Sequence, residues 1–430
     1  MRRIGLMVVL LCWSSTLPAA ESPPEDGWDD WGDDWDEPAA GRLVWTGFVE
    51  GGLGVRTDGT EPHRATLAEL RARAETEWVG DAVTLAFKGD VWNDAVTEAF
   101  DAELRELTAS FSLGERVDVT AGQQVLTWGT GDLVFLNDLF PKDFQSFFAG
   151  RDDEYLKAPS ASIRLTHYGD AVNTDLVWTP VFEPDSYLTG ERFSFYLPGA
   201  GVIGAPEPDL SADEPDGDLA HGEIALRLFT RREATEYALY GYRGYYKQPA
   251  GVRDDGTLYH PKLSVYGASV RRPAGSGVFN AELAWYDSRE DRGGDDPRVP
   301  NSQARLLFGY ERELIRNWQV GVQYYAEWTD AQDRAEAAAV DPALVPDELR
   351  SLLTARITGR LNRETLTLSL FTFYSPSDDD VHYRPQASYR LSDAWTVTAG
   401  ANLFAGDSPA TFFGQLDRND NAWVRVTRYY

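Results

Sequence analysis

Arginine is the side chain in this sequence whose spacing suggests a chemical task. Several arginines stand on the polar side of segments in which polar and apolar residues alternate, and a period of two places them on one face of a β-sheet. A guanidinium stays charged and binds carboxylate or phosphate through two parallel hydrogen bonds, so a row of them inside a barrel would favour anionic solutes. The candidates for such a pore-lining row are Arg164, Arg227, Arg231, Arg305, Arg356, Arg360, Arg384 and Arg390.

Glutamates share the same polar face, among them Glu223, Glu311 and Glu327. Opposite charges on neighbouring strands attract each other across a sheet. The arginines therefore have a second interpretation, as partners that pair with carboxylates and stiffen the wall. The sequence leaves both interpretations open.

Residues suited to catalysis or metal binding are sparse. The five histidines are scattered without the spacing of metal ligands, and no glycine-rich phosphate loop opens a helix. We therefore expect no catalytic residues, no metal, no cofactor and no enzyme activity. A formal net charge of -29, from 40 basic and 69 acidic residues, also argues against a nucleic-acid partner, because phosphate binding needs a basic surface.

Residues 1–20 are expected to be a secretory signal peptide. Basic residues precede an apolar run from Ile4 to Trp13, and small residues follow up to Ala20, where we expect cleavage. The apolar run is too short to cross a bilayer as a helix. The only cysteine, Cys12, lies in this segment, so we expect the mature chain to contain no thiol and no disulfide.

Residues 21–41 form an acidic tail, which we expect on the periplasmic side of the membrane. The stretch from Glu21 to Glu37 contains nine carboxylates, no basic residue, and Trp28, Trp31 and Trp35. Such charge runs are typical of disordered, solvated segments. The tryptophan spacing of three and then four would place the rings on one face of a short helix, so a docking peptide for a basic groove of a periplasmic partner is the alternative to disorder.

From residue 42 onward the dominant pattern has a period of two. In residues 381–391, apolar or aromatic residues at odd positions interleave with polar residues at even positions, so one face can meet lipid and the other water. The segment 66–78 alternates as well, although it consists of good helix formers. The expected strands begin near Leu43, Thr66, Ala82, Ala102, Val117, Ala158, Ala171, Ala220, Ala234, Tyr259, Gly277, Asn301, Trp318, Arg350, Glu364, Val381, Ala394 and Ala422.

The connections between these strands tend to alternate between short and long. Gly80-Asp81 and Gly169-Asp170 are short, whereas residues 128–157 and 183–219 are long. Mean hydropathy of -0.40 and the lack of a long apolar run beyond the N-terminus exclude a helical membrane protein. We therefore predict an all-β fold for residues 42–430, a transmembrane antiparallel up-and-down β-barrel of about 18 strands with both termini in the periplasm.

Aromatic residues at strand ends favour this barrel over a secreted β-sandwich or propeller. Trp45, Trp178, Trp285 and Trp328 stand where the aromatic girdles of a membrane barrel would lie, in contact with outer-membrane lipid and lipopolysaccharide. The chain ends in an alternating strand closed by Tyr430. This ending resembles the signal that the barrel-insertion machinery of the bacterial outer membrane recognises.

One long connection is unusually rich in phenylalanine. Buried aromatic rings are favourable and exposed ones are not, so we expect the segment 128–157 to fold into the lumen and narrow it. Packing against neighbouring loops or forming a trimer contact are the alternatives. The constriction candidates are Phe135, Phe140, Phe144, Phe147 and Phe148.

Two short motifs resemble porin-like outer-membrane families that include alginate-export and phosphate-selective channels. Gly122-Gln123-Gln124 is followed by Trp128-Gly129, and the stretch from Phe413 to Asp420 precedes the last strand. Related families commonly have Gly-Arg-Gln at the first motif, so Gln123 is a departure. The resemblance implies diffusion through an eighteen-stranded pore without naming the solute, and a related group is associated with lipid exporters.

These observations together predict an outer-membrane channel that passes small or polymeric anionic solutes by diffusion. The first alternative is the outer-membrane component of a lipid or polysaccharide export system that docks a periplasmic partner through Trp28, Trp31 and Trp35. The second is a non-conducting structural or adhesive barrel.

Overall fold

The computed structural model describes residues 43–197, 201–205, 211–339 and 345–430. The expected signal peptide, the acidic tail, and Trp28, Trp31 and Trp35 within it lie outside the described residues.

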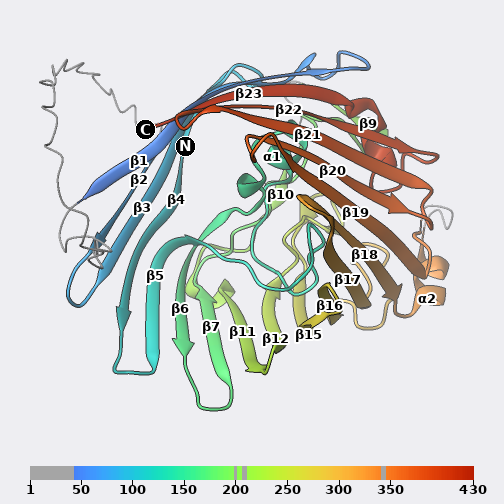
Figure 1. Cartoon of the computed structure of the whole chain (residues 1–430). Helices are drawn as coiled ribbons and strands as arrows, with labels where there is room; N and C mark the ends of the chain where they lie inside the picture. The colour runs from blue at the N-terminus through green and yellow to red at the C-terminus, as the bar shows by residue number, and fades with distance from the viewer. Residues whose placement is uncertain (1–42, 198–200, 206–210, 340–344) are drawn as a thin grey trace, which may run out of the picture. The chain divides into compact units, whose positions relative to one another are not determined.

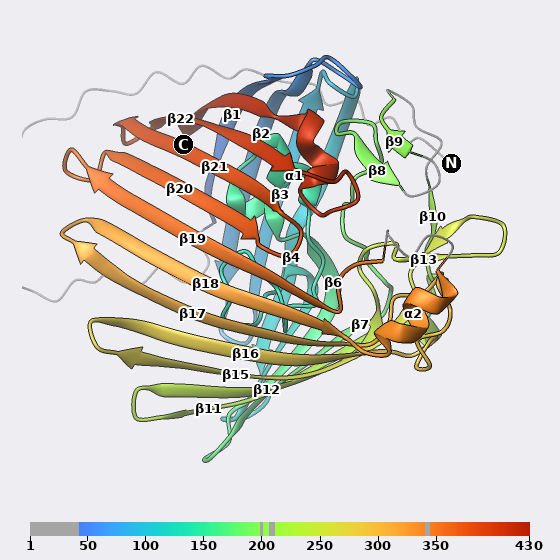
Figure 2. The same cartoon turned by 90° about the vertical axis from the view of Figure 1, so that its right-hand side faces the viewer.

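Eighteen long strands form one closed antiparallel barrel (Figures 1 and 2). Each strand pairs with the next long strand along the chain, and β1 pairs with both β2 and β23, which closes the ring. The strands are β1 (Val44–Arg56), β2 (Ala65–Val79), β3 (Thr84–Asp94), β4 (Ala99–Ser112), β5 (Val117–Val125), β6 (Pro159–His167), β7 (Asn173–Thr179), β11 (Glu223–Arg232), β12 (Thr235–Tyr245), β15 (Lys262–Ala274), β16 (Gly277–Ser288), β17 (Gln303–Ile315), β18 (Trp318–Thr329), β19 (Leu349–Leu361), β20 (Leu366–Ser375), β21 (Asp380–Ser392), β22 (Trp395–Gly406) and β23 (Asn421–Tyr429).

The predicted eighteen-stranded up-and-down barrel is confirmed, and each predicted strand start lies within three residues of the observed one. The segment of helix formers is strand β2, paired along its length with β1 and β3. Helix propensity is worth only tenths of a kcal/mol per residue. Two hydrogen-bonded edges and a period-two pattern outweigh that preference here.

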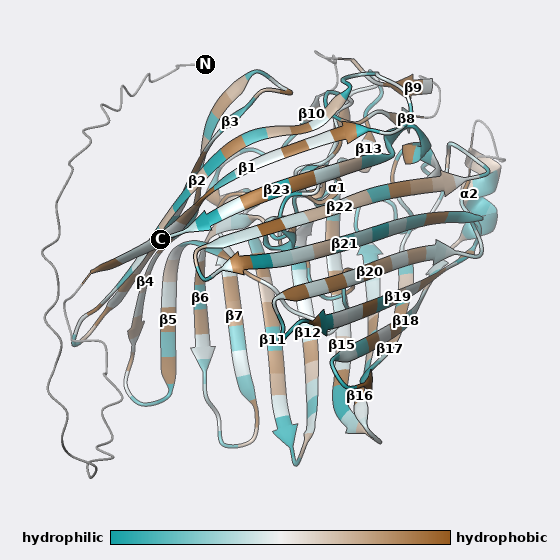
Figure 3. Ribbon diagram, turned by 45° about the horizontal axis from the view of Figure 1, so that its top comes forward, coloured by the Kyte–Doolittle hydropathy of each residue, from teal (hydrophilic) through white to brown (hydrophobic). Residues whose placement is uncertain are grey.

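The alternation sorts side chains between the two faces of the wall. On β21, Tyr383 and Tyr389 are exposed on the outside, whereas His382 and Arg384 are buried inside the barrel. Figure 3 shows the same banding of apolar and polar residues along the other strands. The outer wall carries many exposed large apolar side chains, including Leu53, Leu70 and Phe100. None of the helices in the described ranges is long and apolar enough to cross a membrane.

The two rims of the barrel differ in the length of their connections. One rim carries turns such as 80–83, 113–116 and 233–234, and the first and last barrel strands also begin and end there; we name it the short-turn rim. The opposite, long-loop rim carries 126–158 and 180–222, although its connections 95–98 and 376–379 are short. The long loops contain β8 (Phe195–Leu197), β9 (Gly201–Ile203), η2 (Leu219–His221), β10 (Ala212–Asp213), β13 (Gly251–Val252), β14 (Leu258–Tyr259), α2 (Gln332–Ala338) and η4 (Gly414–Asn419).

The last residue fastens the seam where the barrel closes. The Tyr430 backbone exchanges two hydrogen bonds with Gly47, and its hydroxyl donates to the Arg73 carbonyl oxygen at 2.5 Å. A Cβ at Gly47 would meet that same carbonyl. The expected role of Tyr430 as an insertion signal stays a prediction.

The glycine of the Gly122-Gln123-Gln124 motif gives a test of the wall. Gly122 has φ +131°, and a Cβ there would lie 2.0 Å from the Leu107 carbonyl oxygen. We expect Gly122→Ala to lower the free energy of unfolding by about 2 kcal/mol or more, because both the backbone conformation and the contact are strained. Urea unfolding of the refolded barrel in lipid vesicles, followed by tryptophan fluorescence, measures this.

The matched control is Gly51→Ala on β1, where an added Cβ has no atom within 4 Å. We expect its unfolding midpoint to stay near that of the parent protein. Equal midpoints for Gly122→Ala and the parent would contradict the assigned strain.

Candidate functional site

The connection between β5 and β6, residues 126–158, lies inside the barrel and is called the inward loop (Figure 1). It contains the short helix α1 (Phe144–Ala149) and the turn η1 (Asp153–Leu156). The Asp143 carboxylate caps α1 by accepting the Ser146 amide hydrogen at 2.8 Å, and Gly150, with φ 82°, ends it. These local signals shape the loop, but its position depends on contacts with the wall.

A buried carboxylate on β16 holds the first part of the inward loop. Glu282 is 2% exposed and accepts hydrogen bonds from the Gly131 amide at 2.9 Å, the Thr130 hydroxyl at 2.9 Å and the Asn137 side chain at 2.7 Å. The Thr130 amide also donates to it. A buried charge needs this many donors, so the loop and the glutamate stabilise each other.

Strands β18 and β19 hold the next residues. The Gln323 side chain accepts from the Asp132 amide and donates to the Asp132 carbonyl oxygen, both at 2.8 Å. Arg356 pairs with the Asp132 carboxylate at 2.7 Å. Burial raises the pKa of the Asp132 carboxyl, while Arg356 opposes that shift.

The far end of the inward loop is fastened to the opposite side of the wall. The Tyr155 hydroxyl donates to Asp90 on β3 at 2.5 Å and accepts from Arg73 on β2 at 2.8 Å. Asp153 pairs with Arg384 on β21 at 3.0 Å, and Asn402 on β22 donates to the Phe148 carbonyl oxygen at 2.8 Å. The loop is therefore tied to strands on both sides of the lumen.

The five phenylalanines of the inward loop all lie inside the barrel. Phe140 packs against the inner wall of β12, β15, β16 and β17. Phe147 and Phe148 belong to a second cluster with Phe373, Phe404 and Phe413, in which the Phe148 and Phe404 ring centroids are 5.5 Å apart. Phe135 and Phe144 are partly buried and face a cavity. The role of all five phenylalanines in narrowing the lumen stays a proposal.

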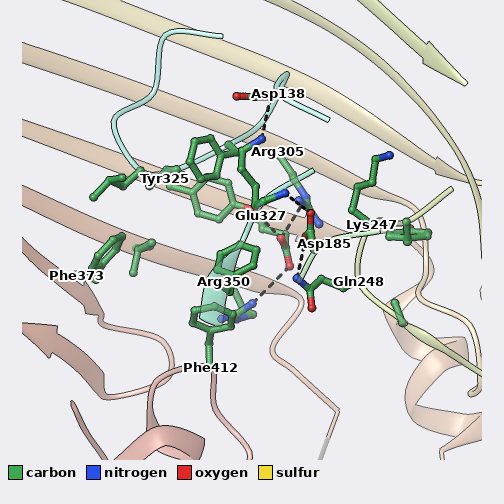
Figure 4. Close-up of a pocket in the computed structure, with 18 of the residues that line it drawn as sticks. Asp138, Asp185, Lys247, Gln248, Arg305, Tyr325, Glu327, Arg350, Phe373 and Phe412 are labelled. Atoms are coloured by element: carbon green, nitrogen blue, oxygen red, sulfur yellow. Dashed lines mark hydrogen bonds and ion pairs between the residues drawn. The ribbon is translucent and has the colours of Figure 1, made fainter. Parts of the chain in front are cut away.

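A cavity of about 460 Å³ lies between the inward loop and the long-loop ends of β16 to β21 (Figure 4). Most of its lining is apolar. A second cavity of about 270 Å³ shares Phe144, Phe148, Gln248 and Phe412 with it and reaches the outer loops. The apolar lining of the first cavity includes Leu133, Phe135, Phe144, Leu352, Phe373 and Phe412.

One side of the cavity is polar, and we name Gln303, Arg305, Tyr325, Glu327 and Arg350 the charged wall. The Glu327 carboxylate lies 3.2 Å from Arg305 and 3.7 Å from Arg350, and it accepts from the Tyr325 hydroxyl at 2.6 Å. Arg350 also pairs with Asp378 at 2.7 Å. Figure 4 shows Arg305, Glu327 and Arg350 directed toward one another, with Phe373 lying apart from them.

Several other polar residues of the lining have partners within the protein. Lys142 pairs with Asp138 at 3.0 Å, and Lys247 pairs with Glu223 at 2.5 Å. Asp185 accepts from the Lys142 amide at 2.7 Å, and burial raises the pKa of its carboxyl. The cavity therefore offers a large apolar surface beside cations that are already paired with carboxylates.

The eight predicted pore arginines fall into two groups. Arg164, Arg227, Arg305, Arg356 and Arg384 pair with Asp175, Glu236, Glu327, Asp132 and Asp153, respectively. Arg231, Arg360 and Arg390 are exposed near the short-turn rim and form no ion pair with any described residue. Arg164, Arg227 and Arg305 pair across neighbouring strands, and Arg356 and Arg384 pair with the inward loop. A role of the eight arginines in lining a pore stays a prediction.

Several residues that build the site were not singled out from the sequence. Glu282, Gln323 and Tyr155 carry the loop contacts, and Tyr286 donates to the Leu136 carbonyl oxygen at 2.7 Å. The period-two pattern contains the signal that would have placed Glu282 and Gln323 on the inner face. Nothing in the sequence identified their partners, which lie on average well over a hundred positions away.

Metal-ligating side chains are not clustered in the described ranges. No set of three or more His, Cys, Asp or Glu side chains there is placed to hold a metal ion. The side chains around the cavity can bind and orient a solute.

Glu282 provides a test of the loop anchor. Glu282→Gln keeps the size of the side chain but leaves one acceptor oxygen for four donors, which costs about 1.5–3 kcal/mol of loop stability. We expect hydrogen exchange in residues 126–140 to become about tenfold faster or more. Exchange mass spectrometry of the protein in detergent measures this.

Glu311→Gln is the matched control, because Glu311 pairs with the exposed Arg271 and makes no hydrogen bond to the described loop. Equal exchange in the Glu282→Gln variant and the parent would show that the carboxylate does not hold the loop.

Comparisons with known proteins bear on the barrel. No family model matches the chain, and no curated protein sequence matches it.

Several solved structures have a barrel similar to that of this chain. OccK2 (OpdF) of Pseudomonas aeruginosa, in complex with glucuronate, aligns with a TM-score of 0.53 at 11% identity, over 90% of this chain and 97% of that chain. OccK5 (OpdH) of the same organism aligns with the same TM-score of 0.53, the same 11% identity and the same coverage of the two chains. OccAB3 of Acinetobacter baumannii aligns with a TM-score of 0.52 at 10% identity, over 90% and 99% of the two chains. At this identity the likeness establishes one thing: the chain has the eighteen-stranded barrel fold seen in these outer-membrane channels.

Proposed function

We propose that the chain forms a porin-like channel in the bacterial outer membrane. A closed sheet leaves no unpaired strand edge, and its apolar outer face is suited to lipid. The short-turn rim, where the chain enters and leaves the barrel, faces the periplasm in this proposal, and the long loops face outward. Contact with outer-membrane lipid and assembly by the insertion machinery follow from that placement.

The inward loop narrows the channel in this proposal. It is tied to β16, β18 and β19 on one side and to β2, β3, β21 and β22 on the other. A wide polymer would require many of these contacts to break. We therefore propose small solutes rather than polymeric ones.

The observation that carries the solute class is the apolar cavity beside the charged wall. Its lining supports a solute with an apolar or aromatic body and one polar end. The Arg305 guanidinium lies 3.8 Å from the centre of the Tyr286 ring and next to Glu327. An entering carboxylate would compete with Glu327 for this guanidinium, while Glu327 keeps its contact with Arg350 at 3.7 Å.

An anionic preference has two supports. Arg231, Arg360 and Arg390 are unpaired among the described residues and stand near the short-turn rim, where they would attract anions. One similar barrel, OccK2, is in complex with glucuronate, a carboxylate. The export component that docks a periplasmic partner through Trp28, Trp31 and Trp35, and the non-conducting barrel, stay as alternatives.

Planar-bilayer recording with a salt gradient tests the channel and its charged wall together. We expect Glu327→Gln to move the reversal potential toward anion selectivity, because Arg305 and Arg350 lose their shared partner. Arg305→Gln is expected to shift it the opposite way. The expected change is about twofold to tenfold in the anion-to-cation permeability ratio.

Asp81→Asn removes the same charge from an exposed turn between β2 and β3 and serves as the control. A silent bilayer with folded protein would overturn the channel. Reversal potentials of Glu327→Gln and Arg305→Gln that match the parent would remove the charged wall from the conduction path.

A further inference from the structure

Three cations gather on the outer wall at the long-loop ends of β12, β15 and β16, which are neighbours in the sheet (Figure 2). The outward positions of these strands are marked by exposed Leu239, Tyr266 and Leu283. Arg243 and Lys262 have the outward parity of their strands and are exposed. Arg289 directly follows the last residue of β16 and has the same odd numbering as the outward-facing Leu283.

Strand register places the three side chains together. The Arg289 amide donates to the Lys262 carbonyl oxygen at 3.1 Å, so these two residues lie opposite each other. Arg243 pairs with Ser264, which makes it the diagonal neighbour of Lys262. Residues opposite each other have Cβ atoms roughly 5 Å apart and diagonal ones roughly 7–8 Å. We name Arg243, Lys262 and Arg289 the outer cation cluster.

The members of the outer cation cluster have no close partner among the described residues. None of its members forms an ion pair or a side-chain hydrogen bond with the residues that the structure describes. The nearest carboxylate in register is Asp287, opposite Ser264, and both of its oxygens are taken by Arg292 at 2.9 and 2.8 Å. Like charges opposite each other destabilise a sheet, so an anion from outside the chain would stabilise this arrangement.

The electrostatic environment of Arg289 agrees with this geometry. Burial lowers the pKa of Arg289 and the neighbouring Arg243 guanidinium lowers it further, while Tyr245 and Asp287 oppose that shift.

An aromatic floor lies directly below the cluster. Tyr266 is 58% exposed on the outer wall, and it pairs in register with Trp285. One step further down, Leu239 and Leu283 are exposed and apolar. Tyrosine and tryptophan at this position mark the level where acyl chains give way to headgroups. The cations therefore stand at headgroup height if the barrel spans a membrane.

We propose that the outer cation cluster binds the phosphate groups of an outer-leaflet glycolipid. This proposal rests on the membrane placement given under the proposed function, but not on conduction. Two guanidinium groups and one ammonium supply the fork and point charges that phosphate accepts, and the aromatic floor meets the acyl chains. The site thereby fixes one face of the barrel to the lipid that surrounds it.

Binding of bisphosphorylated lipid A to the full-length purified protein in detergent tests this proposal, with native mass spectrometry as the readout. We expect the triple variant Arg243→Gln, Lys262→Gln, Arg289→Gln to bind about a hundredfold more weakly, since each cation near a charged lipid contributes on the order of fivefold. Lipid A stripped of both phosphates is expected to bind the parent no better than the triple variant binds lipid A.

Arg272→Gln with Arg428→Gln is the matched control, since both residues are exposed at the short-turn rim. It is expected to keep parental affinity, and Lys262→Arg, which keeps the charge, is expected to do the same. Heat-modifiable gel migration establishes that every variant is folded.

Equal binding of lipid A by the triple variant and the parent, or equal binding of the phosphate-free lipid by the parent, would overturn the site. Lipid binding is measured by mass spectrometry and is therefore independent of whether the protein conducts ions. If the protein binds lipid A but carries no current in bilayers, the lipid site is supported and the proposed channel is contradicted. If the protein conducts but either equal-binding result is found, only the lipid site is contradicted.

Discussion

The structure depends on one constraint: every backbone N–H and C=O group of a strand surrounded by lipid must find its partner within the sheet. Antiparallel pairing satisfies the groups of each strand only if the first and last strands also meet, and β1 and β23 do so over nine paired positions, Phe48 to Arg56. Closure then fixes which side of each strand faces outward. The period-two alternation of the sequence is the consequence of that choice, because one face must suit lipid and the other must suit a polar interior.

The polar interior in turn makes the inward loop possible. A loop of 33 residues, 126–158, brings many backbone groups into the lumen, and these need partners. Inner-face side chains such as Glu282, Gln323 and Asn402 supply them. The phenylalanines of the loop then pack against apolar positions of the inner wall, and the remaining space between loop and wall is the apolar cavity. The same charges that line the lumen are thus largely used in holding it together, with the free ones left near the short-turn rim.

The fold was predictable from the sequence to a large extent, and the site only in part. Alternation is a local signal, so it located every barrel strand, including β2 with its helix-forming residues. The phenylalanine-rich connection could be expected inside the lumen because exposed rings are unfavourable. The partner of Glu282 could not be predicted, because Thr130 and Asn137 are separated from it by 152 and 145 positions. The cavity could not be predicted from the sequence for the same reason, since its lining residues Leu133, Phe373 and Phe412 come from three distant segments.

The central claim is that the lumen conducts and that its apolar cavity holds a solute with an apolar body and an anionic end. Single-channel recording of the parent protein tests it most directly, with benzoate added on the long-loop side and gluconate as an anion without an apolar body. The account predicts a steady current that benzoate interrupts in proportion to its concentration, with far fewer interruptions by gluconate. A steady current that the two anions interrupt equally, or that neither interrupts, would contradict it.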